Sequence, residues 1–163
     1  MRRVAPADAP RAGTKRILFV CTGNICRSPL AEAIFAHQAR AAGRGGEFEV
    51  DSAGTHAYHE GDRADPRARR VGAARGVDVA SIAREIRDSD FERFDLILAM
   101  DRGHVRELRR RCPEPLRERI RLMGELVGEP GGDVPDPYYQ DQEAFEEVFD
   151  LLDGYTRRLL AQL

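Results

Sequence analysis

The stretch Arg16-Ile17-Leu18-Phe19-Val20-Cys21-Thr22-Gly23-Asn24-Ile25-Cys26-Arg27-Ser28-Pro29 decides the fold of this chain. Its first part is a continuous apolar run, which is typical of a strand buried on both faces. The next part contains Gly23 and Asn24, two residue types that accept a left-handed backbone. Ser28 and Pro29 then fit the N-cap and the first position of a helix. The stretch therefore predicts a strand, a tight loop and a helix in direct succession.

The predicted loop suits an oxyanion of the size of phosphate. Backbone N–H groups in such a loop point into a concavity, and the helix N-terminus adds positive potential. The same field favours the thiolate form of Cys21, a nucleophile, and Arg27 offers a planar fork for two phosphate oxygens. We expect the substrate-binding residues of the loop to be Thr22, Gly23, Asn24, Ile25, Cys26 and Ser28. The chemistry indicated is phosphoryl transfer onto Cys21; the alternative, a small core cysteine before an ordinary turn, leaves Arg27 unexplained.

Strand and helix patterns alternate along the rest of the chain. Strands are predicted near residues 16–21, 48–50, 95–100 and 120–123, and helices after Ser28, from Pro66 and over 102–111. A closing helix places one apolar stripe on a single face: Phe145, Val148, Phe149, Leu152, Tyr155 and Leu159. This order predicts a single-domain, doubly wound α/β fold, flavodoxin- or Rossmann-like, with a four-stranded parallel sheet and helices on both faces.

One edge of that sheet collects the candidate functional residues. Ligands in such folds bind beyond the carboxyl ends of the strands. Cys21, Ser52 and Asp101 each fall at a predicted strand end, and Asp136 lies in the loop after the fourth strand. We therefore expect one site to bring these side chains together.

Composition limits the classes of function. With 163 residues and a net charge of −2, the chain suits one domain over residues 15–163 and offers no general case for binding nucleic acid. Residues 1–14 are rich in Pro and Ala and are predicted to be a flexible extension. No stretch is long enough to span a membrane, and Arg2-Arg3 precedes no apolar segment, so we expect no secretion signal. Three cysteines make no disulfide framework and fit a reducing cytoplasm.

Three motifs give the chain a resemblance to a known family. Cys-x5-Arg-Ser with Gly-Asn inside it, Asp51-Ser52-Ala53-Gly54-Thr55 and Asp136-Pro137-Tyr138-Tyr139 occur in the order seen in low-molecular-weight protein tyrosine phosphatases. The resemblance runs from about Lys15 to Leu163. It implies a phosphoric monoester hydrolase that acts on phosphotyrosine-containing proteins through a phosphocysteine, needs no cofactor and is a monomer.

The resemblance also assigns Asp136 as the general acid and base. Taken alone, Asp136-Pro137 fits an ordinary turn better. In the family setting the carboxyl protonates the departing phenolate and then activates water. Asp101 and Asp133 are the alternatives. Three tyrosines are implied as aromatic walls of the site: Tyr58, at a position where the family often has Trp, Tyr138 and Tyr139.

Other implied roles concern the loop itself. Family resemblance suggests a reversible disulfide between Cys26 and Cys21, although Cys26 could simply fill space behind the loop. Ser28 is both a helix cap and a partner for the Cys21 sulfur. A supporting His of many family members aligns with Ser81. Related phosphatases that act on phosphoarginine carry Thr where this chain has Ile25, so Ile25 implies phosphotyrosine.

Two other functions and a metal site fit these residues less well. Arsenate reductases share the loop type but need further cysteines, and residues 77–93 contain none. A non-enzymatic phosphate-binding module would leave the Cys21 nucleophile without a use. His56 and His59 make only a weak metal pair without a third ligand, so no metal is predicted.

Overall fold

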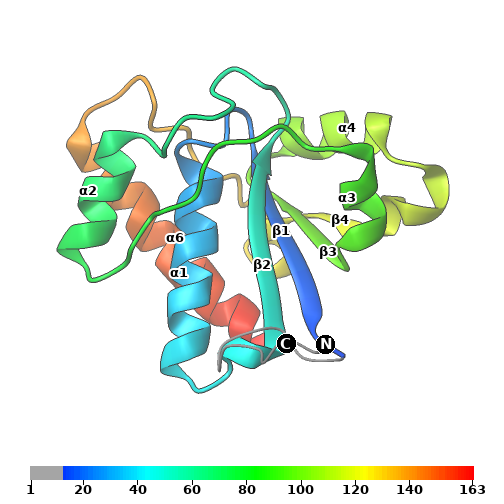
Figure 1. Cartoon of the computed structure of the whole chain (residues 1–163), viewed down its shortest axis with the longest axis horizontal. Coiled ribbons are helices and arrows are strands. Elements are labelled where there is room, and N and C mark those ends of the chain that lie inside the picture. Colours follow the sequence, from blue (N-terminus) through cyan, green and yellow to red (C-terminus); the bar gives the residue numbers. More distant parts are fainter. Residues whose placement is uncertain (1–12) are drawn as a thin grey trace, which may run out of the picture.

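The structure is a computed structural model that describes residues 13–163. The predicted flexible extension, residues 1–14, thus lies outside the described residues except for its last two. Four strands form one parallel sheet in the order β2-β1-β3-β4 (Figure 1). Their bounds are β1 (Lys15–Cys21), β2 (Phe48–Gly54), β3 (Leu96–Ala99) and β4 (Ile120–Leu122). The predicted doubly wound, parallel α/β fold is therefore confirmed.

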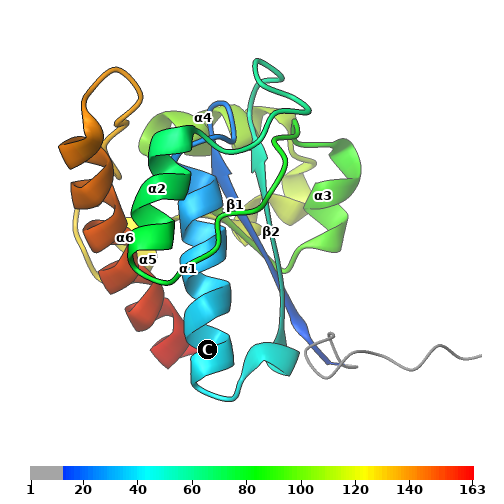
Figure 2. The ribbon, with the colours of Figure 1, turned by 60° about the vertical axis from the view of Figure 1, so that its left-hand side comes forward.

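Helices cover both faces of this sheet, as predicted. One face carries α1 (Arg27–Ala41), α2 (Pro66–Ala74) and α6 (Gln142–Gln162), and the other carries α3 (Asp88–Arg93) and α4 (Arg102–Arg111) (Figure 2). Short elements complete the chain: the 3-10 helices η1 (Gly45–Glu47) and η2 (Glu114–Arg119), and α5 (Met123–Leu126). Neither α3 nor α5 was predicted, because six and four residues are too few for a periodic pattern.

Strand β1 is the centre of both cores. Ile17 and Phe19 face the core shared with α1 and α6, whereas Leu18 and Val20 face the core shared with α3 and α4. All four are fully buried. Burial of each such side chain stabilises the fold by about 1.5–3 kcal/mol, which explains an apolar run without alternation.

The closing helix α6 packs its predicted stripe against this sheet and α1. All six residues of the stripe are buried. Gln38 of α1 fastens the pair, because its Nε2 donates to the backbone carbonyl and the Oδ1 atom of Asp153 at 3.1 and 3.0 Å. This contact holds α1, whose first turn carries the predicted loop, in a fixed position.

The predicted cap of α1 is wrong. The helix begins at Arg27 with Cys26 in the cap position, and no side chain caps it. The Ser28 hydroxyl instead lies 2.9 Å from the Cys21 sulfur. Pro29 becomes the third helical residue, where its missing N–H costs nothing because first-turn N–H groups have no partner within the helix.

The second strand is longer than predicted, and Ser52 therefore belongs to it. Strand β2 runs to Gly54, so Ser52 lies inside it, opposite Phe19 of β1, and not at its end. Gly54 allows the end of β2 to lie close to the loop after β1, because a Cβ at this position would lie 2.6 Å from the Thr22 carbonyl oxygen. Of the two loop residues that accept a left-handed backbone, Gly23 and Asn24, only Asn24 uses it, with φ at 58°. The loop and β2 are thus fitted to one another.

Candidate active site

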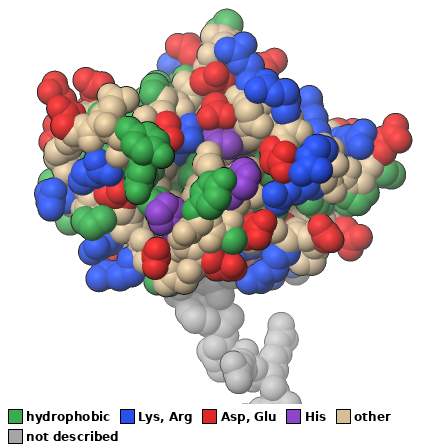
Figure 3. All heavy atoms as spheres, turned by 90° about the horizontal axis from the view of Figure 1, so that it is seen from above, with side chains coloured by type: hydrophobic (Ala, Val, Ile, Leu, Met, Phe, Trp, Pro, Cys, Tyr) green, Lys and Arg blue, Asp and Glu red, His purple; other side chains and the backbone are tan. Residues whose placement is uncertain are grey.

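A pocket of about 130 Å³ opens at the carboxyl end of β1, above the predicted loop. Figure 3 shows this end of the molecule, with histidine side chains near its middle and charged side chains around them. The pocket is lined by Cys21, Thr22, Gly23, Ile25, Cys26, Arg27, Tyr58, His59, Asp136, Tyr138 and Tyr139. Segments far apart in the sequence therefore meet around one cysteine.

Two expected substrate-binding residues lie elsewhere. Asn24 and Ser28 are buried beneath the loop and do not line the pocket. His59, considered above only as half of a metal pair, does line it, and its ring lies 6.0 Å from that of Tyr138. The sequence offered no signal for this, because His59 belongs to a long connection without periodic structure.

Cys21 lies at the floor of the pocket with 3% of its surface exposed. Its sulfur is 2.9 Å from Ser28 Oγ, and Ser28 Oγ accepts a hydrogen bond from Asn24 Nδ2 at 2.8 Å. Because Asn24 supplies a proton to that oxygen, the Ser28 hydroxyl proton is available to the sulfur. This arrangement suits a sulfur that carries negative charge.

Asn24 fixes the loop from below. Its amide also donates to Ser52 Oγ at 2.9 Å, and its Oδ1 accepts from the backbone N–H of Arg84 at 3.0 Å. One side chain thus joins the loop to α1, β2 and the segment before α3. Ser81 takes no part, since its buried Oγ has no hydrogen-bond partner in the structure.

Arg27 is held from one side and open on the other. Its Nη1 donates to Asp101 Oδ2 at 2.9 Å and to the Val134 carbonyl at 3.0 Å, while the side chain is only 4% exposed. Burial opposes charge on Asp101, but hydrogen bonds from the His104 backbone N–H and the Arg27 guanidinium, with the positive charge of Arg27, hold its pKa below the ordinary value. Asp101 is therefore a charged anchor for Arg27 and not a proton donor, and Asp133 pairs with Arg102 away from the lining.

Asp136 stands at the rim, where 45% of its side chain is exposed. Its Oδ2 is 3.7 Å from Arg27 Nη2, and its Oδ1 accepts from the Tyr138 N–H at 3.1 Å. Tyr138 and Tyr139 meet edge to face at 4.8 Å, and Tyr58 stacks on His56 across the opening. A carboxyl and aromatic rings thus surround the entrance above the thiol.

His104 is a buried neighbour of the site that the sequence did not reveal. Its Nε2 lies 2.8 Å from Thr22 Oγ1, and its Nδ1 accepts from the Asp101 N–H at 3.2 Å. Burial lowers the pKa of His104 to about 4, against the opposing effect of the Asp101 charge. The available signal was the pair Asp101 and His104 at the start of α4, which form a reciprocal cap; such caps more often use Glu or Gln.

Glu32 of α1, which is partly buried, is a second neighbour of the site that the sequence did not reveal. Its Oε1 accepts from Ser52 Oγ at 2.6 Å and so extends the network of Asn24. Burial raises the pKa of Glu32 to about 7, in spite of the Ser52 hydrogen bond. Arg84 gives it little help, because Arg84 pairs with Asp51 and Asp90 at 3.1 and 2.9 Å.

The two histidines proposed as a weak metal pair make other contacts. His56 Nδ1 lies 2.8 Å from Thr55 Oγ1, and His59 Nδ1 lies 3.6 Å from Asp62. Within residues 13–163 no group of three or more His, Cys, Asp or Glu side chains is arranged to hold a metal ion. No helix in that range has the length and apolar character needed to cross a membrane.

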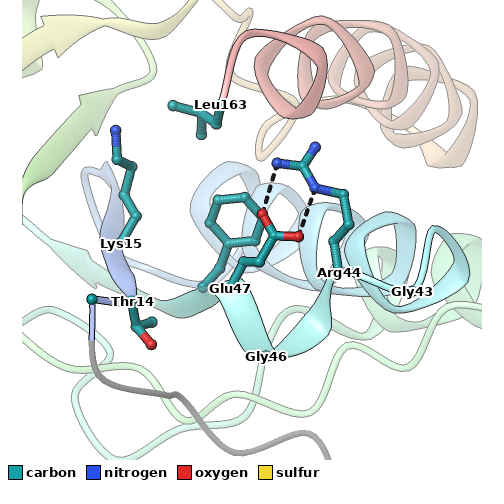
Figure 4. A pocket seen from close by; sticks show the side chains of 9 residues that line it. Thr14, Lys15, Gly43, Arg44, Gly46, Glu47 and Leu163 are labelled. Atoms are coloured by element: carbon teal, nitrogen blue, oxygen red, sulfur yellow. Dashed lines mark hydrogen bonds and ion pairs between the residues drawn. The ribbon is translucent and has the colours of Figure 1, made fainter.

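A larger cavity, about 380 Å³, lies at the opposite end of the sheet (Figure 4). Its charged side chains are Lys15, Arg44 and Glu47, and Arg44 donates two hydrogen bonds of 3.0 Å to Glu47. The guanidinium is thus already occupied, and no cysteine lines this cavity. The smaller pocket, and not this larger cavity, is lined by Cys21, Arg27 and Asp136.

Known proteins resemble the whole of this unit. A family profile described as low molecular weight phosphotyrosine protein phosphatase matches residues 16–163. A low molecular weight protein-tyrosine-phosphatase of Streptomyces coelicolor is 45% identical over 91% of this chain and 93% of its own. The crystal structure of an Entamoeba histolytica protein tyrosine phosphatase has a TM-score of 0.87 at 42% identity, over 91% and 96% of the two chains. The YwlE arginine phosphatase of Bacillus subtilis has a TM-score of 0.86 at 30% identity, over 91% and 95%.

The raised pKa of Glu32 makes the stability of the fold depend on pH. The pKa is about 7 in the folded protein and 4.5 for an ordinary, unfolded glutamate. The protonated carboxyl therefore makes its full contribution to the free energy of unfolding below pH 4.5, and this contribution is lost as pH rises through 7. Glu32→Gln should therefore match wild type near pH 5 and exceed it by about 2 kcal/mol near pH 8.5. Urea unfolding at both pH values measures this. Glu146→Gln, an equal charge change on the exposed face of α6, is the control; an equal effect of Glu32→Gln at both pH values contradicts the prediction.

Proposed function

The chain belongs to the low molecular weight phosphotyrosine protein phosphatase family, a family of phosphoric monoester hydrolases, and we propose that it hydrolyses protein phosphotyrosine through a phosphocysteine on Cys21. One observation carries this proposal. The Cys21 thiol lies at the floor of a pocket whose wall holds the buried Arg27 guanidinium and whose rim holds the Asp136 carboxyl. From the floor to the rim, the pocket thus holds a nucleophile, a phosphate ligand and a proton donor, which places the phosphoryl group at the thiol and the leaving oxygen near the carboxyl.

In the first step Cys21 sulfur attacks phosphorus and the bond to the phenolic oxygen breaks. The Arg27 edge that does not bind Asp101 faces the pocket, where it can hold two phosphoryl oxygens as charge develops on them. Asp136 gives its proton to the departing phenolic oxygen. The arginine needs no rearrangement to do this, because Asp101 and Val134 already fix it.

In the second step Asp136 removes a proton from water, and that water attacks the phosphorus. The bond between phosphorus and sulfur breaks, phosphate leaves, and Cys21 departs as a thiolate. The Ser28 hydroxyl, 2.9 Å from the sulfur, stabilises this leaving group. Ser28 and Asn24 therefore contribute from beneath the loop without contact to the substrate.

Asp136→Asn tests the acid role. An asparagine cannot protonate the leaving oxygen, so phosphorylation of Cys21 should slow by about 100-fold for poor leaving groups and much less for activated phenols. Single-turnover rates across a series of aryl phosphates measure this dependence. The matched control is Asp133→Asn, which changes a carboxylate outside the pocket lining. An equal loss for every leaving group would show that Asp136 is not the acid.

Substrate choice is proposed to depend on Ile25 and the tyrosine walls. Ile25 is nearly buried and lines the pocket, where a branched aliphatic side chain offers apolar contact to a phenyl ring. A phosphoarginine guanidinium against Ile25 would have N–H groups without partners, at about 1–3 kcal/mol each. One structural relative is named an arginine phosphatase, so hydrolysis of phosphotyrosine and of phosphoarginine should be compared directly in this protein.

We expect phosphotyrosine peptides to be preferred over matched phosphoarginine peptides by at least about tenfold in kcat/KM, from one unpaired donor. Ile25→Thr should shift the ratio towards phosphoarginine, because its hydroxyl can pair with the guanidinium. Phosphate release from both peptides measures this, and Cys21→Ser must lose both activities. Equal efficiencies for wild type would overturn the tyrosine assignment, and activity of Cys21→Ser would overturn the cysteine mechanism.

A reversible redox protection of Cys21 is proposed for Cys26. Peroxide converts the Cys21 thiolate to a sulfenic acid; Cys26 then attacks that sulfur, a disulfide forms and water leaves. Both thiols line the pocket, and Cys112 lies in the core on the opposite face of the sheet. Burial raises the pKa of Cys26, so it stays protonated while Cys21 reacts first. A reducing cytoplasm, which returns the disulfide to thiols, is the setting we propose.

Cys26→Ser should make peroxide inactivation harder to reverse. Wild type should regain activity with dithiothreitol, whereas the variant should accumulate Cys21 sulfinic acid. Mass spectrometry of the oxidised protein identifies both products, and Cys112→Ala is the control thiol. Equal sulfinic acid in wild type and Cys26→Ser would favour the space-filling role of Cys26.

A further inference from the structure

His104 of α4 lies between the loop and the anchor of Arg27, and none of the steps above uses it. The side chain is 5% exposed. One ring nitrogen, Nε2, is 2.8 Å from Thr22 Oγ1, and the other, Nδ1, is 3.2 Å from the Asp101 backbone nitrogen. A buried ring with both nitrogens engaged has a fixed orientation.

The contact with the backbone decides which nitrogen carries the proton. Two atoms of Asp101 lie near Nδ1 of His104: the backbone N–H at 3.2 Å and Oδ1 at 3.3 Å. Asp101 Oδ1 already accepts from the His104 N–H at 3.0 Å, and a backbone N–H can only donate. We therefore assign Nδ1 as the acceptor of the Asp101 N–H, without a proton of its own. The proton of a neutral imidazole is then on Nε2, which donates to Thr22 Oγ1. Burial favours this neutral form, and so does the nearby Arg27, although the carboxylates of Asp101, Asp136 and Asp133 oppose it.

This tautomer leaves the Thr22 hydroxyl proton unused. Thr22 Oγ1 accepts from His104 and has no second hydrogen-bond partner among the described residues. Thr22 follows Cys21 directly and lines the same pocket. A hydroxyl has one proton to donate, and here that proton is free for a ligand above the thiol.

Resting on the proposed function, we propose that the Thr22 hydroxyl donates a hydrogen bond to a phosphoryl oxygen of the substrate, and that His104 is the positioning residue that directs it. His104 touches no substrate; it acts by occupying the acceptor side of Thr22 Oγ1. The same ring accepts from Asp101, which holds Arg27 at 2.9 Å. One imidazole therefore orients a donor on each side of the bound phosphoryl group.

Inorganic phosphate, used as a competitive inhibitor of p-nitrophenyl phosphate hydrolysis, tests this proposal. Thr22→Val removes the donor but keeps the shape, and should weaken phosphate inhibition by about tenfold, while Thr22→Ser should restore it. In His104→Asn the side chain can still accept the Asp101 backbone N–H, but it cannot reach Thr22, so phosphate inhibition should weaken as in Thr22→Val. The variant with both changes should bind phosphate no more weakly than Thr22→Val alone. His37→Asn, on the exposed face of α1, is the matched histidine control.

Wild-type phosphate inhibition in Thr22→Val overturns the proposal, and so do multiplied effects in the variant with both Thr22→Val and His104→Asn. Thermal unfolding of each variant separates these outcomes from loss of fold. Nitrogen-15 NMR of the wild-type imidazole must show His104 protonated at Nε2 and not at Nδ1; the opposite tautomer also overturns it. Calorimetric phosphate binding to Cys21→Ser and to Cys21→Ser/Thr22→Val tests the hydroxyl without turnover, so a failure of the cysteine mechanism remains distinguishable.

Discussion

The left-handed backbone of Asn24 is the constraint on which the site depends. With φ at 58°, the chain turns sharply enough for the loop to return to the start of α1, and the side chain is directed downwards into the protein. Its amide then binds Ser28, Ser52 and the Arg84 backbone. These hydrogen bonds offset the energetic cost of a positive φ at a residue other than glycine. The position of the Cys21 sulfur follows, because Ser28 contacts both Asn24 and that sulfur.

The buried charge of Arg27 is a second constraint on the site. A guanidinium with 4% exposure needs partners, and Asp101 and the Val134 carbonyl supply them. Asp101 in turn caps α4, and His104 completes that cap while it reaches back to Thr22. Arg27, the start of α4 and Thr22 are therefore parts of one hydrogen-bonded unit. A change at His104 reaches the pocket without touching the substrate.

The sequence predicted the sheet, its helices and the family because those depend on local signals: an unbroken apolar run before Cys21, a stripe on α6 and three motifs in order. It also predicted that Arg27 and Asp136 would meet Cys21, since parallel strands end at one edge. It failed where contacts depend on the path of the folded chain. Ser28 was expected to cap α1, but the turn at Asn24 places its hydroxyl against the Cys21 sulfur, where it also accepts from the Asn24 amide. His104 and Glu32 matter through partners 82 and 20 residues away, which no local pattern reveals.

The site has a buried floor, which holds Cys21 and Arg27, and an exposed rim, which carries Asp136 and the tyrosines. Cys21 and Arg27 are buried, and each has hydrogen-bond partners that fix its position. Tyr58 and Tyr139, at 70% and 89% exposure, contact little besides neighbouring rings. Rim residues can therefore differ while the floor stays intact. Solved structures with this fold, at 42% and 30% identity, are named for a tyrosine and for an arginine phosphatase. We propose that substrate preference in this chain depends on Ile25 and on the tyrosines of the rim, and that it can be altered while Cys21 and its hydrogen-bond partners stay in place.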